Sequence, residues 1–189
     1  MPIRQLVNAD APQMIACINE TYNFLRNQGV LPRGIENWTT ATAIAWRNMG
    51  YVAYGWERPD VPGRIDAVAV GRTETLRRPG DISRQWWTLA IAAVRAQTIP
   101  DIGKKHESAF IRATRLGLER ASNAGLAGVH ALYPSNWNRL DNFIRTLSAP
   151  ELVVLPNGIT EVWVPFPAGQ IEYSSRWPTL TDDPATDLP

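Results

Sequence analysis

The chain has 189 residues, of which 44% are hydrophobic and 20% charged, with 19 basic and 18 acidic side chains. That size suits one domain with its own core, and the charge balance leaves no electrostatic footprint for nucleic acid or an anionic membrane. The single cysteine, Cys17, excludes an internal disulfide and fits the cytoplasm or another reducing compartment. With only two histidines besides, we expect no soft-metal site.

The first third of the chain predicts one strand and two helices. Residues 3–8 have the pattern of a short strand. Asp10 then offers an acidic cap, with a proline in the first turn and Gln13 placed to reach back, which is typical of a helix start. Gly29 would end this helix. A second helix is expected after Asn37, and Gly50 would close it.

The middle of the chain predicts three strands, a long helix and a fourth strand. Residues 51–56 and 65–75 form a predicted hairpin, because the segment between them is rich in proline and glycine. Residues 86–94 are almost continuously apolar, as expected of a strand buried on both faces. A loop and the longest helical pattern of the chain follow, and residues 127–133 are again predicted to form a strand.

The last part of the chain predicts a helix, a hairpin and a tail. Ser135 would cap the helix, whose apolar stripe has ideal helical spacing. Residues 151–155 and 159–166 form a predicted hairpin around Asn157-Gly158, a strong turn signal. Residues 167–189 are rich in proline, serine and aspartate, which predicts a tail without its own core. We expect this tail to pack on its own domain or on a protein partner.

The order of elements, β-α-α-β-β-β-α-β-α-β-β, resembles that of the GCN5-related N-acetyltransferase (GNAT) family. The resemblance covers residues 1–166 and leaves 167–189 as the tail. It implies an α/β (α+β) fold with a mixed central sheet of about seven strands flanked by about four helices. It also implies acetyl-coenzyme A as cofactor and an amine as acceptor, and neither nucleic acid nor membrane as partner.

The resemblance also implies where coenzyme A would bind. Its pantetheine arm would add to the backbone of the apolar strand, and its pyrophosphate would lie at the start of the long helix, where backbone N–H groups are unpaired. An asparagine often follows the second strand of this unit in the family. The cofactor-binding candidates are Val94, Gly103, Lys104, Lys105, His106 and Asn136.

Several residues depart from the family pattern or have a simpler explanation. The phosphate loop of the family usually reads Gln/Arg-x-x-Gly-x-Gly/Ala, whereas Gly103 is the one glycine of this loop and Pro100 removes an N–H donor. The two lysines after it could be an ordinary solvated first turn. Asn136 also fits simple helix-start chemistry. Phe143 stands where the family often has a tyrosine that protonates the leaving thiolate.

Three residues are candidates for the proton transfers of acyl transfer. Glu74, at the end of a strand, and His130, on the strand after the long helix, are alternative bases. Tyr133 could supply the proton that Phe143 cannot. Each of the three also has an ordinary structural explanation, as a solvated carboxylate or a residue packed on a strand.

Two functions therefore stay open at this point. One is an acetyl-CoA-dependent N-acetyltransferase, favoured by the strand–helix–strand unit and the basic helix start. The other is a catalytically inactive binding or structural protein of the same fold, such as a phage virion component. It would use tryptophan-rich surfaces and the tail, and it would then be virion-associated. Eight tryptophans are many for this length, and core packing is the other explanation for them.

Overall fold

The computed structural model describes residues 3–31, 34–58, 61–95, 117–118, 120–138, 141, 144–145 and 150–166. The expected phosphate loop, most of the long helix and the tail lie outside these residues. The strands are β1 (Ile3–Gln5), β2 (Val52–Glu57), β3 (Ile65–Arg77), β4 (Ser83–Val94), β5 (Gly128–Pro134), β6 (Glu151–Val154) and β7 (Ile159–Pro165). The helices with described bounds are the 3-10 turn η1 (Asn8–Asp10), α1 (Ala11–Asn27) and α2 (Thr40–Asn48).

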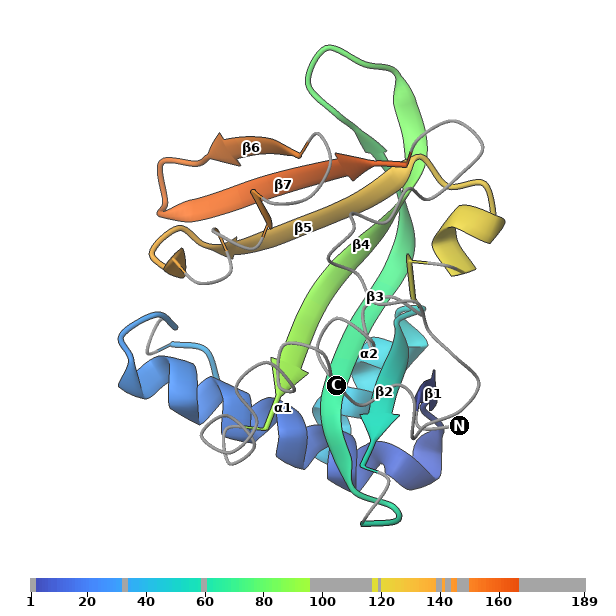
Figure 1. Cartoon of the computed structure of the whole chain (residues 1–189), viewed down its shortest axis with the longest axis vertical. Coiled ribbons are helices and arrows are strands. Elements are labelled where there is room, and N and C mark those ends of the chain that lie inside the picture. Colours follow the sequence, from blue (N-terminus) through green and yellow to red (C-terminus); the bar gives the residue numbers. More distant parts are fainter. Residues whose placement is uncertain are drawn as a thin grey trace. The chain divides into compact units, whose positions relative to one another are not determined.

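The seven strands form one sheet in the order β1-β2-β3-β4-β5-β7-β6 (Figure 1). Strands β4 and β5 are parallel, whereas β5 and β7, β6 and β7, and β1 and β2 are antiparallel. The parallel pairing of β4 with β5 agrees with the predicted strand–helix–strand unit, and β6 and β7 form the predicted hairpin. The prediction of a mixed seven-stranded α+β sheet is confirmed.

The chain divides into two compact units, and each is described by itself. Among the described residues, the first unit contains 3–70, 91–95 and 117, apart from the gaps given above. The second contains 71–90 and the described residues from 118 onward. The prediction of one domain over residues 1–166 stays a prediction.

The core of the first unit forms where α1 meets the neighbouring strands. Met14, Cys17 and Ile18 lie on the buried side of α1 and pack with Ile65 and Val68 of β3. Four of these five side chains are at most 1% exposed. Burying a residue of this kind contributes about 1.5–3 kcal/mol, so this cluster is a main source of stability for the unit.

The start of α1 differs from its predicted form. Val7 N–H donates to Asp10 Oδ2 at 2.7 Å, and the chain already turns at η1. The first strand therefore ends at Gln5 and not at residue 8. Asp10 also forms an ion pair with Arg4 at 2.6 Å, and Gln13 accepts from Arg95 at 2.8 Å instead of reaching back to the cap. Contacts of Asp10 with Arg4 and of Gln13 with Arg95 thus replace the helix cap that the sequence predicts.

The start of α2 is also later than predicted. Asn19 of α1 bonds both backbone groups of Trp38: its Oδ1 accepts from the N–H at 2.7 Å and its Nδ2 donates to the carbonyl at 2.9 Å. These bonds hold Trp38 in the segment before the helix. Thr39 is the cap, and its hydroxyl accepts from the N–H of Thr42 at 3.2 Å. Capping by threonine satisfies an N–H that the first helical turn leaves unpaired.

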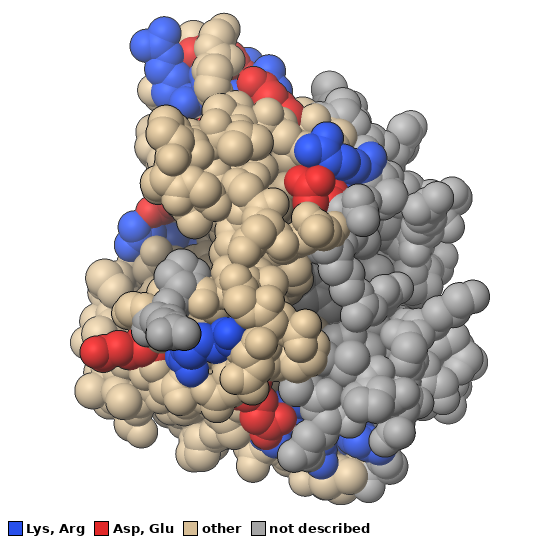
Figure 2. All heavy atoms as spheres, turned by 90° about the vertical axis from the view of Figure 1, so that its left-hand side faces the viewer, with Lys and Arg blue, Asp and Glu red and all other residues tan. Residues whose placement is uncertain are grey.

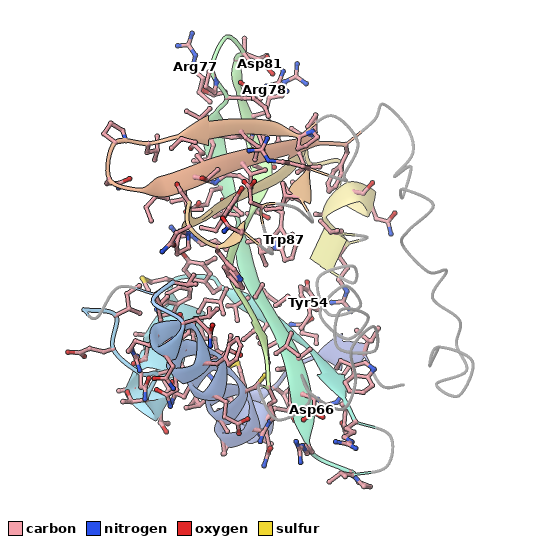
Figure 3. The ribbon with its side chains drawn as sticks, turned by 60° about the vertical axis from the view of Figure 1, so that its left-hand side comes forward. Tyr54, Asp66, Arg77, Arg78, Asp81 and Trp87 are labelled. Carbon is pink, nitrogen blue, oxygen red and sulfur yellow. The ribbon has the colours of Figure 1, made fainter. Side chains whose placement is uncertain are left out.

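A buried carboxylate near the start of β3 is held by arginines of the first unit (Figure 3). Asp66 is 1% exposed, and it accepts from Arg64 Nε at 2.7 Å. Arg95 Nε lies 3.6 Å from the same oxygen and donates to the Ile65 carbonyl at 2.9 Å. A buried charge needs such partners to remain ionised. Arg95 therefore ties the end of β4 to β3 and α1.

In the second unit the register of the strands assigns residues to two faces of the sheet. Thr88 of β4 lies opposite His130 of β5, which lies opposite Trp163 of β7. Residues opposite one another in register share a face, and neighbours along a strand alternate. We call the face of these three residues the histidine face. The opposite face, here the tyrosine face, contains Tyr133 and Val162, which pack with Ile144.

The tryptophans are mainly core residues. Five of the seven that the structure describes are buried, namely Trp38, Trp56, Trp86, Trp87 and Trp163. The other two, Trp46 and Trp137, are half-buried and pack against core clusters. The abundance of tryptophan is therefore explained by packing in the described part of the chain.

The described surface carries both signs of charge. Figure 2 shows basic and acidic side chains mixed on the coloured part of one face. Arg77, Arg78 and Asp81 lie at the hairpin between β3 and β4 (Figure 3), where Arg77 Nε donates to the Asp81 carbonyl at 2.8 Å. Within the described residues, no helix has the length and apolar character needed to cross a membrane.

Candidate active site

The parallel pairing of β4 and β5 is short. It joins Trp87, Thr88 and Leu89 to Val129, His130 and Ala131. The next residues, Ala90 of β4 and Leu132 of β5, are not paired with each other. A strand whose ladder stops in this way keeps backbone N–H and C=O groups that an extended ligand can bond. Pairing that stops before the strands end is what the family resemblance implies for the pantetheine arm.

His130 is the central polar residue of the histidine face. It is 7% exposed, and its Nε2 lies 2.9 Å from Oε1 of Glu161 on β7. Its ring is tilted by 41° against the ring of Trp163, with 4.3 Å between centroids. The other ring nitrogen, Nδ1, is buried and has no hydrogen-bond partner among the described residues. The imidazole is thus held at one nitrogen and unpartnered at the other.

Glu74 of β3 lies on the same face. Arg72 donates to its Oε1 through Nε at 2.7 Å. Partial burial acts to raise the pKa of Glu74, but the Thr88 hydroxyl, the Arg72 guanidinium and the nearby His130 outweigh it, so the pKa lies below its usual value. A carboxylate stabilised in this way is ionised at neutral pH but accepts a proton weakly. Glu74 is therefore better suited to stabilise a positive charge than to act as the base.

Thr88 lies between Glu74 and His130 on this face. Its hydroxyl is close enough to Glu74 to lower the pKa of that carboxyl, yet the buried oxygen has no partner at good hydrogen-bond geometry among the described residues. Thr88 and Glu74 are therefore neighbours without a formed hydrogen bond. Trp86 also lies on this face, and its ring is edge-on to the ring of Trp163, with 4.9 Å between the ring centroids.

Tyr133 lies on the tyrosine face, away from the two candidate bases. It is three residues from His130 in a strand with unbroken register, so the two side chains point to opposite sides of the sheet. Its hydroxyl donates to Asp141 Oδ1 at 2.7 Å. Burial, followed by this bond and the charge of Asp141, raises the pKa of Tyr133 to about 12. Tyr133 and His130 therefore do not belong to the same catalytic site.

The cofactor-binding candidates have different positions. The backbone of Val94 is bonded by Thr21 of α1, whose hydroxyl donates to the carbonyl at 2.7 Å and accepts from the N–H at 2.9 Å. A ligand strand at Val94 would have to displace Thr21. Asn136 is exposed in the turn after β5. Gly103, Lys104, Lys105 and His106 lie outside the described residues.

Sequence reasoning missed three of the residues described above: Thr21 in the first unit, and Thr88 and Glu161 in the second. Thr21 has one signal, because it lies four residues after Cys17 on the buried side of α1, where a polar residue needs a partner. Glu161 has no local signal, since its contact with His130 depends on the strand order. The described residues contain no group of three or more acidic, histidine or cysteine side chains that could hold a metal.

Comparison with solved structures identifies the fold. A structure of the NatC complex bound to Gag peptide and CoA matches with a TM-score of 0.56 and 8% identity, over 88% of this chain and all of that chain. An aminoglycoside acetyltransferase from an uncultured soil metagenomic sample, in complex with trehalose, matches with a TM-score of 0.59 and 12% identity, over 81% and 91%. No protein-family model and no curated protein matches the sequence.

The ribosomal-protein-S18-alanine N-acetyltransferase from Escherichia coli also matches, with a TM-score of 0.55 and 11% identity, over 94% of this chain and 98% of that one. Two of these three neighbours are acetyltransferases and the third binds CoA. The chain therefore has the fold of the GNAT acetyltransferases, as the resemblance implied. Identities this low define the fold and leave the substrate to be determined. None of the three supports the alternative of a virion component.

Proposed function

We propose that this chain transfers an acyl group from a coenzyme A thioester, with acetyl-CoA as the expected donor, to an amine. The observation that carries the proposal is the parallel β4–β5 pair whose ladder stops after Leu89 and Ala131. In a GNAT fold this strand is where the extended arm of the donor would add its own hydrogen bonds. The structural neighbours support the same class of reaction.

The residues present fit such a donor in part. The backbone of Ala90 lies where pairing with β5 has ended, which suits an added strand. Val94 fits less well, because Thr21 already bonds both of its backbone groups. We therefore place the arm before Val94 on β4. Lys104 and Lys105, which lie outside the described residues, remain the proposed contacts of the pyrophosphate, as positive charges at the helix start that the sequence predicts.

The chemistry requires two changes in bonding. The bound thioester supplies an activated acyl carbon: the amine nitrogen forms a bond to it, and the carbon–sulfur bond breaks. The amine loses a proton and the thiolate gains one. His130, supported by the ionised Glu74, is proposed to serve the first transfer. Tyr133 is a poor source for the second because its pKa is raised to about 12 and it faces the other side of β5.

Titration calorimetry of the full chain with acetyl-CoA and CoA tests the proposal. The wild-type protein should bind both, and donor at about 100 times its Kd should add about 2.7 kcal/mol to the free energy of unfolding. Reversing both charges, Lys104→Glu with Lys105→Glu, should abolish binding.

The matched control reverses two exposed arginines of the β3–β4 hairpin, Arg77→Glu with Arg84→Glu, which makes the same change in net charge. This variant should bind normally. Absence of binding between the wild-type chain and millimolar acetyl-CoA would refute the proposed function. Equal binding by the lysine variant would refute only the pyrophosphate site.

A further inference from the structure

The bonding of His130 assigns different tasks to its two ring nitrogens. Nε2 lies 2.9 Å from Oε1 of Glu161, a carboxylate that can only accept a hydrogen bond when ionised. The neutral imidazole therefore carries its hydrogen on Nε2. The lone pair is then on Nδ1, which is buried and has no partner among the described residues. The bond made by one ring nitrogen sets the state of the other.

We infer that Nδ1 of His130 is the atom that accepts the proton of the acceptor amine, and that Glu161 is a positioning residue that holds the imidazole in the required tautomer. This inference rests on the proposed function. In this step, the lone pair of the amine nitrogen forms a bond to the acyl carbon. When the N–H bond breaks, its electron pair stays on the nitrogen. The proton passes to Nδ1, the imidazole becomes an imidazolium, and the thiolate leaves.

The surroundings of the ring favour this role. Trp163 packs on one side of the imidazole at 4.3 Å and limits its rotation. The charged groups that face it are Glu161 from β7 and Glu74 with its partner Arg72 from β3, while β4 presents the neutral Thr88. The carboxylate of Glu161 next to the ring complements the positive charge that the imidazole gains when it accepts a proton.

The two carboxylates also provide a route by which the proton can pass from His130 to solvent. The side chain of His130 is 8% exposed, whereas those of Glu161 and Glu74 are 23% and 22% exposed. A buried base thus lies between two groups that reach solvent. A histidine with a purely structural role would gain more from a partner at both nitrogens, because buried polar atoms are nearly always bonded. The unpartnered nitrogen is the observation that points to a ligand.

Nitrogen-15 NMR of the full-length protein tests the tautomer without any substrate. The chain has two histidines, so His106→Asn leaves only the ring signals of His130. We expect the neutral ring in the Nε2–H form. Glu161→Gln should mix the two tautomers. Glu151→Gln on β6, whose carboxylate lies 3.5 Å from Arg78, should leave the tautomer unchanged. An Nδ1–H tautomer, or a spectrum unaffected by Glu161→Gln, overturns the role of Glu161.

Steady-state kinetics tests the proton transfer, with acetyl-CoA as donor, a panel of primary amines as acceptors, and thiol release as the signal. His130→Gln should lower kcat by about 10²–10⁴-fold. Glu161→Gln should lower kcat and leave the KM for acetyl-CoA unchanged, because fewer rings then carry the lone pair on Nδ1. Glu151→Gln should match the wild type.

Unchanged kcat and pH profile in His130→Gln would overturn the inference while the transferase function stands. Failure of the wild-type chain to bind acetyl-CoA in calorimetry is a separate result, seen before any kinetics. It would refute the proposed function and the inference with it.

Discussion

Replacing Thr21 by valine should destabilise the protein far more than its conservative appearance suggests. The two side chains have nearly the same shape, but valine lacks the hydroxyl that bonds the carbonyl of Val94 at 2.7 Å and its N–H at 2.9 Å. Thr21 and Val94 are both 7% exposed, so water does not replace the lost bonds readily. A buried polar group left without a partner costs about 1–3 kcal/mol.

Two such groups lose their partner, so Thr21→Val should lower the free energy of unfolding by about 2–6 kcal/mol. The bond from Thr21 to the Cys17 carbonyl, at 3.0 Å, adds little because it lies within the helix. Thr21→Ser is the control, since it keeps the hydroxyl and removes one methyl group, at a cost of about 1 kcal/mol.

Urea denaturation followed by tryptophan fluorescence measures both variants, with the midpoint and the slope fitted separately. The expected order of stability is wild type, Thr21→Ser, Thr21→Val. A loss for serine equal to or larger than the loss for valine would show that the hydroxyl contributes no more to stability than the methyl group does. The assignment of the Val94 backbone bonds to Thr21 would then be wrong.

Two further predictions concern charge and close packing. The Arg4 side chain, more than the Val7 N–H, holds the pKa of Asp10 below its usual value against the opposing effect of burial. The contribution of the Asp10 carboxylate to the free energy of unfolding should therefore be complete above its unfolded pKa of about 4, and it should be lost as the pH falls through the lower pKa of the folded state. In thermal melts at a series of pH values, Asp10→Asn should show a weaker loss of stability on acidification than the wild type. Gly71→Ala should lower the free energy of unfolding, measured in urea, by about 3 kcal/mol or more, because the new Cβ would lie 2.7 Å from the Thr88 carbonyl oxygen. Gly34→Ala is the control: its new Cβ meets nothing within 4 Å, so the free energy of unfolding should not change.

Much of the fold could be predicted because its signals are local. Gly29, Gly50 and Gly158 have positive φ angles of 69°, 83° and 76° at the turns where the sequence places them. The Asn157-Gly158 turn joins β6 and β7 in the antiparallel hairpin that it predicts. Such signals depend on a few neighbouring residues and not on the rest of the chain.

The candidate site could be predicted only in part because its contacts are distant in sequence. His130 and Glu74 are recognisable in the sequence as titratable residues on predicted strands, although β4 lies between their two strands in the sheet. The bond from His130 to Glu161 joins residues 31 apart, and it exists because β7 and not β6 lies beside β5. Likewise, Thr21 and Val94 are 73 residues apart. Neither hydrophobic periodicity nor turn chemistry contains the order of strands in a sheet.

The unbroken register of β5 has a consequence for protein engineering. With no bulge between Gly128 and Pro134, each position on this strand is committed to one side of the sheet. A histidine introduced at Ala131 would join the apolar cluster of Tyr133 and Ile144, remote from Glu161. A single-residue insertion before His130 would exchange the two sides altogether. A redesign of the proton acceptor must therefore move in steps of two residues along β5.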